Sequence, residues 1–462
     1  MRAASPWTPR LAEGAGSPYE RLVAALAEDI IGQGGVGGLP AGSRLPAHRA
    51  LARALGISVG TVTKAYAALE RRGLVRGEPG RATFVTYQAQ DTAGSIDLAG
   101  NAPPRMLGDH ALAAALAAVG RRVDASGLAA YGPPGGFLEH RRAVAAWIAL
   151  GGRQFPPDEL ILCNGAQQGL AAALLAASSN GVRAVVYTEA VTFPGFLRYA
   201  SLSGHRVHGV AVDEEGLQPA ALDRALTRRK PSAAQALIYV TPTLHNPTTA
   251  TMGPRRRREI VRVARKHDAV IVEDDVYALS QDRDTISLSS LAPERTFYVT
   301  SASKALSPAV RVGAVRPPRA AWERTETAVR ALAQPVSPLQ CELLAELTRA
   351  GVAREIAMAI RHEGTRRTAL AREMIGPALM TADTGYHAFL PLPRTVAEAV
   401  VLAAATRGVD LTEPASMMAD PNSQQSGIRL CLGAPSYDDL ARGLGIIADI
   451  IGRTGTVRPS GT

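Results

Sequence analysis

Ala269-Val270-Ile271-Val272-Glu273-Asp274-Asp275 is an apolar stretch of strand length that ends in three acids. Helix-length segments separate it from similar runs, which are LILC at 160–163, AVVYTE at 184–189, ALIYVT at 236–241 and TFYVTS at 296–301. This alternation predicts an α/β fold with a mostly parallel sheet. Acids at the C-terminal end of such a strand lie at the edge where ligands bind. Because a helix start can carry the same kind of acid cluster, the motif needs support from elsewhere in the chain.

Lysine is rare in this chain, and one of its four lysines stands apart. Lys64 lies on a helix with polar neighbours, Lys230 ends a run of basic residues, and Lys266 lies in the charged helix ARKHD. Only Lys304 follows an apolar strand through small residues, Ser301-Ala302-Ser303, that leave room for a cofactor. Pyridoxal phosphate needs a lysine amine, an acid that keeps its pyridine nitrogen protonated, and a phosphate cradle. Lys304 and the acid cluster together predict such a site.

Length and composition describe a large chain without a membrane segment. At 462 residues, two or three domains are expected. No apolar run reaches the roughly 18–20 residues of a membrane helix, and the start MRAASPWTPR lacks the apolar core of a secretory signal. The three cysteines have no metal-ligand spacing, which favours a reduced cytoplasm and no metal. The net charge of +10 allows nucleic acid as a partner without proving it.

The first part of the chain has the pattern of a small helical domain. Helices are expected over 19–30, 47–55 and 58–72, and a hairpin around 78–81. On the third helix Val62, Ala65 or Tyr66, and Leu69 are spaced to pack against the second helix. That packing leaves the polar N-terminal end of the third helix for the major groove of DNA. A helix pair with a solvated basic face fits the periodicity equally well.

The residues of this segment resemble one known family. The stretch LPAGSRLPAHRALARALGISVGTVTKAYAALERRGLVRGEPGRATFV at 39–85 is similar to the GntR-type winged helix-turn-helix, wing included. The resemblance implies a DNA-binding domain that meets operator DNA through base edges and phosphates. The residues expected there are Arg44, Arg49, Ser58, Gly60, Thr61, Thr63, Lys64, Tyr66, Arg72, Gly80 and Arg81.

From about residue 96 to 452 the chain resembles class I/II aminotransferases. The motifs that carry this likeness stand in the family's order and include Tyr131-Gly132-Pro133-Pro134-Gly135-Gly136, Asn164-Gly165-Ala166-Gln167, Thr192-Phe193-Pro194-Gly195, Thr241–Thr248, Asp274-Asp275-Val276-Tyr277, Ser301-Ala302-Ser303-Lys304 and Arg311-Val312-Gly313. A GntR-type head before such a body is identified as the MocR subfamily, and the opening Asp97-Leu98 with the short linker resembles its YdcR-like branch.

The resemblance implies an α/β fold class: an N-terminal winged helix-turn-helix, then an aminotransferase body of fold type I with a large parallel-sheet lobe and a smaller α+β lobe. The expected boundaries are a mobile tail 1–17, the DNA-binding domain 18–87, a linker 88–97, the body 98–454 and a tail 455–462. Within the body, the smaller lobe is expected at about 98–130 and 352–454, and the larger lobe at about 131–351.

The resemblance also implies a role for each site residue. Lys304 would hold pyridoxal phosphate as the internal aldimine and move the Cα proton, and Asp274 would pair with the pyridinium. Arg429 would take a substrate carboxylate, with Asn246 beside it. The remaining cofactor contacts are expected from Asn246 and Tyr277 at the phenolic oxygen, Phe193 on the ring face, and Ala166, Gln167, Ser301, Arg311 and the neighbouring subunit's Tyr131 at the phosphate. Two positions depart from the broader class: Thr249 where glycine is common, and Phe193 where Trp or Tyr is common.

Three functions fit these residues. The first is a homodimeric DNA-binding regulator that senses an amino acid or amine through an external aldimine. The second is a working aminotransferase with a vestigial head. The third, a DNA-binding module with a dead cofactor site, is weakened because Lys304, Asp274 and Arg311 are all present. The head has no catalytic use and keeps its DNA-facing residues, which favours the regulator.

Overall fold

The computed structural model describes residues 7, 10–12, 16–31, 39, 42–78, 82–86, 94–124, 132–178, 183–229, 234–280, 285–421, 423 and 425–454. Of the expected site residues, Gly80, Arg81 and Tyr131 lie outside these ranges, as do most of the tail 1–17, most of the linker and the tail 455–462.

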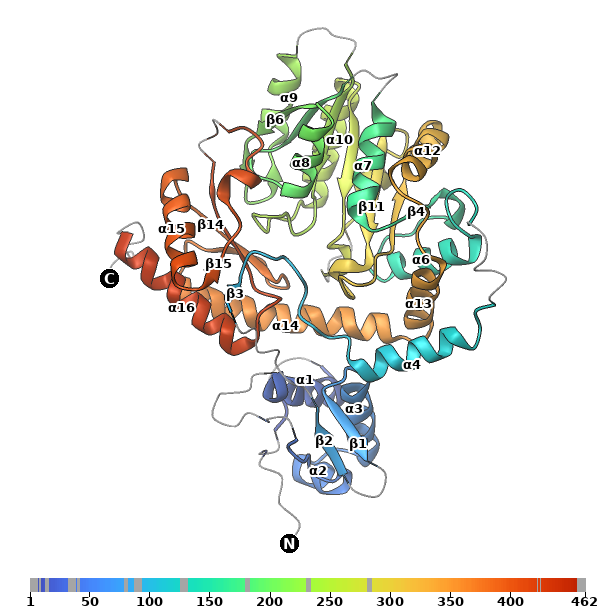
Figure 1. Cartoon of the computed structure of the whole chain (residues 1–462), viewed down its shortest axis with the longest axis vertical. Helices are drawn as coiled ribbons and strands as arrows, with labels where there is room; N and C mark the ends of the chain where they lie inside the picture. Colours follow the sequence, from blue (N-terminus) through green and yellow to red (C-terminus); the bar gives the residue numbers. More distant parts are fainter. Residues whose placement is uncertain are drawn as a thin grey trace.

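The N-terminal head is a winged helix-turn-helix (Figure 1, blue). It consists of α1 (Pro18–Ile31), α2 (His48–Leu55), α3 (Val59–Arg71) and the antiparallel pair β1 (Val75–Glu78) and β2 (Ala82–Val85). Gly56 ends α2 with a φ of 64°, and Ser58 caps α3 by accepting a hydrogen bond from the Thr61 amide at 3.0 Å. Leu51, Val62 and Leu69 are fully buried, as the periodicity of the sequence predicts.

The larger lobe of the body contains a seven-stranded sheet in the order β4-β12-β11-β10-β9-β5-β6. All neighbours from β11 to β6 are parallel, and only β12 runs against its two neighbours. Its strands are β4 (Ile161–Cys163), β5 (Val185–Glu189), β6 (Arg206–Val210), β9 (Ala236–Val240), β10 (Val270–Asp274), β11 (Thr296–Ser301) and β12 (Gly313–Arg316). The five strand-like runs of the sequence are thus five neighbouring or nearly neighbouring strands of one sheet.

Helices pack around this sheet and bury it. They are α6 (Leu138–Ala149), α7 (Ala166–Ala177), α8 (Pro194–Leu202), α9 (Pro219–Thr227), α10 (Pro254–Lys266), α11 (Leu288–Leu291), α12 (Trp322–Leu332) and α13 (Pro338–Arg349). Short 3-10 turns are found at Pro157–Glu159, Ala278–Ser280, Ala302–Lys304, Arg319–Ala321 and Pro414–Met417, and a small hairpin joins β7 (Val212–Asp213) to β8 (Gly216–Leu217).

The smaller lobe is an α+β unit at the C-terminal end. Its strands are β13 (Met380–Thr381), β14 (His387–Pro391) and β16 (Gly427–Cys431), with β3 (Ile96–Asp97) paired in parallel to β15 (Val409–Asp410). The helices α15 (Arg394–Thr406) and α16 (Tyr437–Thr454) cover it. No helix in the described residues is long and apolar enough to cross a membrane.

Two helices connect the parts of the molecule. The long helix α14 (Val352–Ile375) runs along the side of the body that faces the head, from the larger lobe to the smaller one (Figure 1). Its first half shares a core with the larger lobe and its last turns share a core with the smaller one. Helix α4 (Asp109–Gly120) falls in the range expected for the smaller lobe, but Ala111 and Ala115 instead pack in the core that contains α13. Along α14 the packing thus changes from the core of the larger lobe to that of the smaller one.

Candidate functional site

A cavity of about 380 Å³ opens at the C-terminal ends of the parallel strands, between the two lobes. This size lies within the range of small-molecule sites, about 300–1,000 Å³. The expected cofactor residues that line it are Ala166, Gln167, Phe193, Asn246, Asp274, Tyr277, Ser301, Lys304 and Arg311. Gly100, Asn101 and Ala102, which were not expected there, also line it. The structure thus brings together nine residues that the sequence singled out from six separate segments.

Lys304 ends the 3-10 turn that follows β11, and its amine points at the segment before α4. Nζ donates a hydrogen bond to the backbone oxygen of Asn101. Burial lowers the pKa of Lys304 to about 8, and the positive charges of Arg429 and Arg311 act in the same direction. A substantial fraction of the amine is therefore neutral near pH 8, which is the nucleophilic form.

Asp274, the last residue of β10, is the acid that faces the cavity. Tyr239 donates to Oδ2 at 2.9 Å, while Oδ1 is buried and has no hydrogen-bond partner among the described residues. Burial raises the pKa of Asp274 to about 7, and the negative charge of Asp275 adds to the effect. A buried carboxylate with one vacant oxygen calls for a cationic donor from a ligand.

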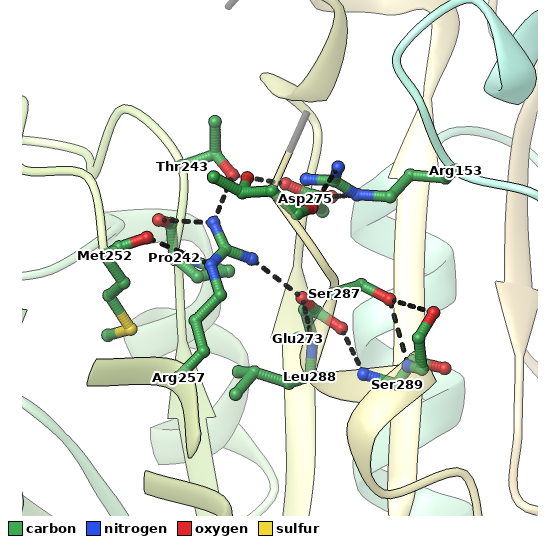
Figure 2. Close-up of polar contacts among 12 residues, drawn as sticks. Arg153, Pro242, Thr243, Met252, Arg257, Glu273, Asp275, Ser287, Leu288 and Ser289 are labelled. Atoms are coloured by element: carbon green, nitrogen blue, oxygen red, sulfur yellow. Dashed lines mark hydrogen bonds and ion pairs between the residues drawn. The ribbon is translucent and has the colours of Figure 1, made fainter. Parts of the chain in front are cut away.

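The two neighbouring acids, Glu273 and Asp275, are turned away from the cavity into a buried ion network (Figure 2). Arg153 donates to Asp275 Oδ2 at 2.9 Å, and Thr243 donates to Oδ1 at 2.7 Å. Arg257 donates to the Thr243 hydroxyl and to the Pro242 and Met252 backbone oxygens. Burial alone would raise the pKa of Asp275, but Arg153 and Arg257 lower it below its ordinary value. The network fixes the end of β10 and the loop that carries Asn246.

The phosphate end of the cavity is formed where α7 begins. Gly165 precedes α7 with a φ of 78°, and a Cβ on it would lie 3.0 Å from the Arg311 guanidinium. Glycine suits this position because its positive φ would strain another residue, and the close arginine leaves little room for a side chain. Ser301 is buried beside it at the end of β11, and Phe193 is half-buried on the cavity wall. The amides at a helix start and a guanidinium form a suitable anion site.

Arg429, on β16, lies next to the cavity and contacts Asn246, one of the residues that line it. Its Nη1 donates to Asn246 Oδ1 at 2.8 Å, and its Nη2 donates to the Ala99 backbone oxygen at 2.8 Å and to Thr412 at 2.7 Å. Nε is buried without a partner among the described residues. The loop that carries Asn246 also contains Thr249, whose φ of 65° lies in the left-handed region. This backbone explains why glycine is common there, since a β-branched residue is strained in that region.

Four site residues were not assigned from the sequence: Asn101, Tyr239, Thr412 and Tyr386. Asn101 Nδ2 donates to the Tyr277 hydroxyl at 2.8 Å, and Tyr386 donates to the Lys304 backbone oxygen at 2.9 Å. Asn101 closely follows the Asp97-Leu98 opening that resembles the YdcR-like branch, and this position was the available signal. Tyr239 looked like an ordinary strand residue, and nothing in its neighbourhood predicts contact with an acid 35 positions away.

The described residues that were expected to face DNA divide into an accessible group and a buried group. Ser58, Gly60, Thr63, Lys64 and Arg49 are exposed, and Thr61 and Arg44 are half-buried.

Two of the expected contacts were wrong for this arrangement. Tyr66 is buried and donates to the Pro46 backbone oxygen at 2.8 Å, so it is a core residue of the head. Arg72 is also buried, because the body covers the end of α3, and its Nη2 lies 3.4 Å from the Met106 sulfur. Both side chains are buried, so neither is accessible for a phosphate contact in this structure.

The residues present fit pyridoxal phosphate. The vacant Asp274 Oδ1 suits a pyridinium N–H, and the buried amine of Lys304 suits an aldehyde. The start of α7 with Arg311 suits the phosphate. Of the expected cofactor residues, nine line this one cavity, and Tyr131 lies outside the described residues.

Comparison with known proteins agrees with both parts of the chain. The family model "Aminotransferase class I and II" matches residues 93–446, and "Bacterial regulatory proteins, gntR family" matches residues 18–85. The chain is similar to the uncharacterized HTH-type transcriptional regulator YdeF of Bacillus subtilis, at 28% identity over 96% of both chains. It is also similar to the pyridoxine biosynthesis transcriptional regulator PdxR of Corynebacterium glutamicum, at 25% identity over 89% of this chain and 92% of the relative.

Among solved structures, the α-aminoadipate aminotransferase LysN of Thermus thermophilus is similar, with a TM-score of 0.69 and 24% identity. The match covers 79% of this chain and 94% of that one. It shows that the two bodies share a fold.

Proposed function

This chain belongs to the class I and II aminotransferases, joined to a gntR-family head in the MocR architecture, and we propose that it is a transcription regulator that uses pyridoxal phosphate to sense an amino acid or amine. The observation that carries the proposal is that one chain combines a cavity lined by nine of the expected cofactor residues with an exposed, polar helix start in the head. Lys304, Asp274 and Arg311 line one cavity, and Lys64 and Thr63 are exposed at the start of α3.

Each residue of the cavity has one task in this proposal. Lys304 holds the cofactor, Asp274 pairs with its ring nitrogen, and Ala166, Ser301 and Arg311 hold its phosphate. Once bound, the cofactor supplies an electrophilic carbon for an amine and an electron sink for the bonds beside it.

The effector class follows from Arg429. A carboxylate forms paired hydrogen bonds with a guanidinium, and Nε of Arg429 is a buried donor that still lacks an acceptor among the described residues. We therefore assign α-amino acids or other amino carboxylates, with Arg429 as the carboxylate contact. Asn246, already bonded to Arg429, orients it.

A second function, transamination, is favoured by one observation. With the pKa of Lys304 lowered to about 8, the amine can serve as a proton carrier near neutral pH once it is displaced from the cofactor. The regulator remains the first proposal because a head with an exposed polar helix start serves no catalytic step.

We further propose that the chain acts as a homodimer in the cytoplasm. Its DNA partner and its three free, buried cysteines fit that compartment. In the dimer, Tyr131 would reach the phosphate of the neighbouring subunit, a role that lies outside the described residues.

The test is fluorescence anisotropy of the full chain on a duplex from its own upstream region, with excess unrelated DNA, with and without pyridoxal phosphate. Saturable binding that survives the competitor and changes with cofactor is expected. Binding that the unrelated duplex abolishes would disprove the regulator, and a screen of amino donors for transamination would then be decisive.

A further inference from the structure

One segment of the body contacts both the cofactor cavity and the head. This strap, residues 96–108, begins as β3 at the edge of the smaller lobe. It then crosses the cavity at Gly100, Asn101 and Ala102 and ends at Gly108, directly before α4. Its path is closely packed, since a Cβ on Gly433 would lie 2.0 Å from the Ala102 backbone oxygen.

At the cavity, the strap is held by the groups that bind the ligands. The Ala99 backbone oxygen accepts from Arg429 at 2.8 Å, and the Asn101 backbone oxygen accepts from Lys304. Asn101 Nδ2 also donates to Tyr277 at 2.8 Å. Lys304, Arg429 and Tyr277 are the side chains assigned above to cofactor and effector.

At its other end, the strap lies against the head. Met106 is buried and its sulfur accepts from Arg72 at 3.4 Å. Gly108 touches the turn after α3 so closely that a Cβ on it would lie 2.1 Å from the Gly73 nitrogen. Arg72 is itself buried, and this burial lowers the pKa of its guanidinium to about 10. The turn of the head at 72–74 therefore rests on the strap.

Ligand binding and the strap compete for the same donors. When Nζ of Lys304 holds the cofactor, it no longer carries the donors of an ammonium group for Asn101. A carboxylate on Arg429 competes likewise with the Ala99 oxygen for Nη2. Only eight residues separate Ala99 from Gly108, so a shift at the cavity has a short path to the head.

We propose that the strap 96–108 transmits occupancy of the cofactor site to the DNA-binding head. When ligands occupy Lys304 and Arg429, the strap loses its hydrogen bonds to these two side chains and releases the turn at 72–74. This inference rests on the proposed function, because it assumes that pyridoxal phosphate binds at Lys304. It adds to that function the route between sensing and DNA binding.

Hydrogen–deuterium exchange of the full chain, with and without pyridoxal phosphate alone, tests the route. In the unsubstituted protein the cofactor should speed exchange about fivefold or more in both the strap and the turn at 72–74, the lower end of common coupling strengths. Visible absorbance of the bound cofactor is recorded in the same samples. Absent absorbance would overturn the proposed function and with it the route, whereas absorbance with an unchanged turn would overturn the route alone.

Gly108→Ala and Gly120→Ala form a matched pair. Gly108 has a φ of −81°, so alanine strains no backbone there, but its methyl group displaces the head from the strap. Gly120 lies at the other end of the same helix, where a Cβ meets nothing within 4 Å. We expect Gly108→Ala to keep the cofactor absorbance and the strap response but lose the response of the turn, and Gly120→Ala to keep all three. A turn that responds normally in folded Gly108→Ala would overturn the proposal, and the unsubstituted protein decides it if that variant does not fold.

Discussion

Lys304 and Asp274 line the same cavity and contribute its amine and its buried carboxyl group. Lys304 was found by excluding three lysines with surface-like neighbours, and the structure buries it in the cavity. Asp274 could not be separated from Glu273 and Asp275 by pattern alone. The separation depends on the alternation of β10, which turns Asp274 to the cavity and its neighbours to the ion network.

Lys304→Ala should abolish the visible absorbance of bound pyridoxal phosphate, because no other amine lines the described cavity. Basal DNA binding should remain, since the head does not contain this residue. An absorbance titration and an anisotropy titration measure the two effects. Lys266→Ala is the control, since that lysine pairs with Asp223 on the surface. Retained absorbance in Lys304→Ala would show that the lysine assignment is wrong.

Asp274→Asn should have opposite effects on the cofactor-free and loaded protein. Burial raises the pKa of Asp274 to about 7, so the folded cofactor-free protein retains a proton that the unfolded chain loses near pH 4. The stability contributed by this group is therefore present at low pH and is lost as the pH rises through 7. The free energy of unfolding of the asparagine variant should exceed that of the unsubstituted protein by up to about 4 kcal/mol at pH 8, and by less at pH 5. Urea unfolding at the two pH values measures this gain.

With pyridoxal phosphate present, the same variant should bind the cofactor at least about tenfold more weakly, because one lost charged hydrogen bond costs about 1.5–3 kcal/mol. Asp275→Asn provides the contrast. This substitution breaks the buried ion pair with Arg153 and should lower the free energy of unfolding by about 3–5 kcal/mol at pH 8. If both asparagine variants destabilised the cofactor-free protein equally, the separate roles of the two acids would be wrong.

Helix α3 has two faces, and the sequence placed most of its residues on the correct one. Val62 and Leu69 are buried and Thr63 and Lys64 are exposed, as the spacing predicts. Tyr66 was ambiguous because a tyrosine can either pack or contact a phosphate. Its hydrogen bond to Pro46, 20 positions earlier, resolves the ambiguity, and periodicity contains no information about such a partner.

Tyr66→Phe and Lys64→Ala should therefore behave differently. Losing the buried hydroxyl should destabilise the head by about 1 kcal/mol and leave the salt dependence of DNA binding unchanged. Removing the lysine should leave stability unchanged and lower the slope of log K against log salt by about 1. Anisotropy titrations at several salt concentrations, with thermal unfolding beside them, measure both. A reduced salt slope in Tyr66→Phe would show that Tyr66 contributes to the DNA contact and is not only a core residue.

At the scale of the whole molecule, the sequence predicts the order of the domains but does not predict how the head docks on the body. The winged head, the parallel sheet and the smaller lobe all follow from local patterns and family motifs. Some contacts between head and body join residues hundreds of positions apart: Arg71 donates to Glu355 at 2.7 and 2.9 Å across 284 residues. Such pairs depend on the final fold, so neither periodicity nor spacing predicts them. The same holds for Arg72, whose burial comes from the body and not from its own helix.

The Arg71–Glu355 pair also tests whether each head rests on its own body. Arg71→Glu or Glu355→Arg alone should loosen the head, because each places like charges together, whereas the double variant in one chain should restore docking. Because the pair is partly exposed, we expect a coupling of about 0.5–1 kcal/mol, or a two- to fivefold change in exchange of the head amides. Mixed dimers of the two single variants contain the restored pair only if a head docks on its partner's body. With the head on its own body, as in this structure (Figure 1), the mixture should exchange as fast as the single variants, and restored protection in the mixture would show docking across the dimer.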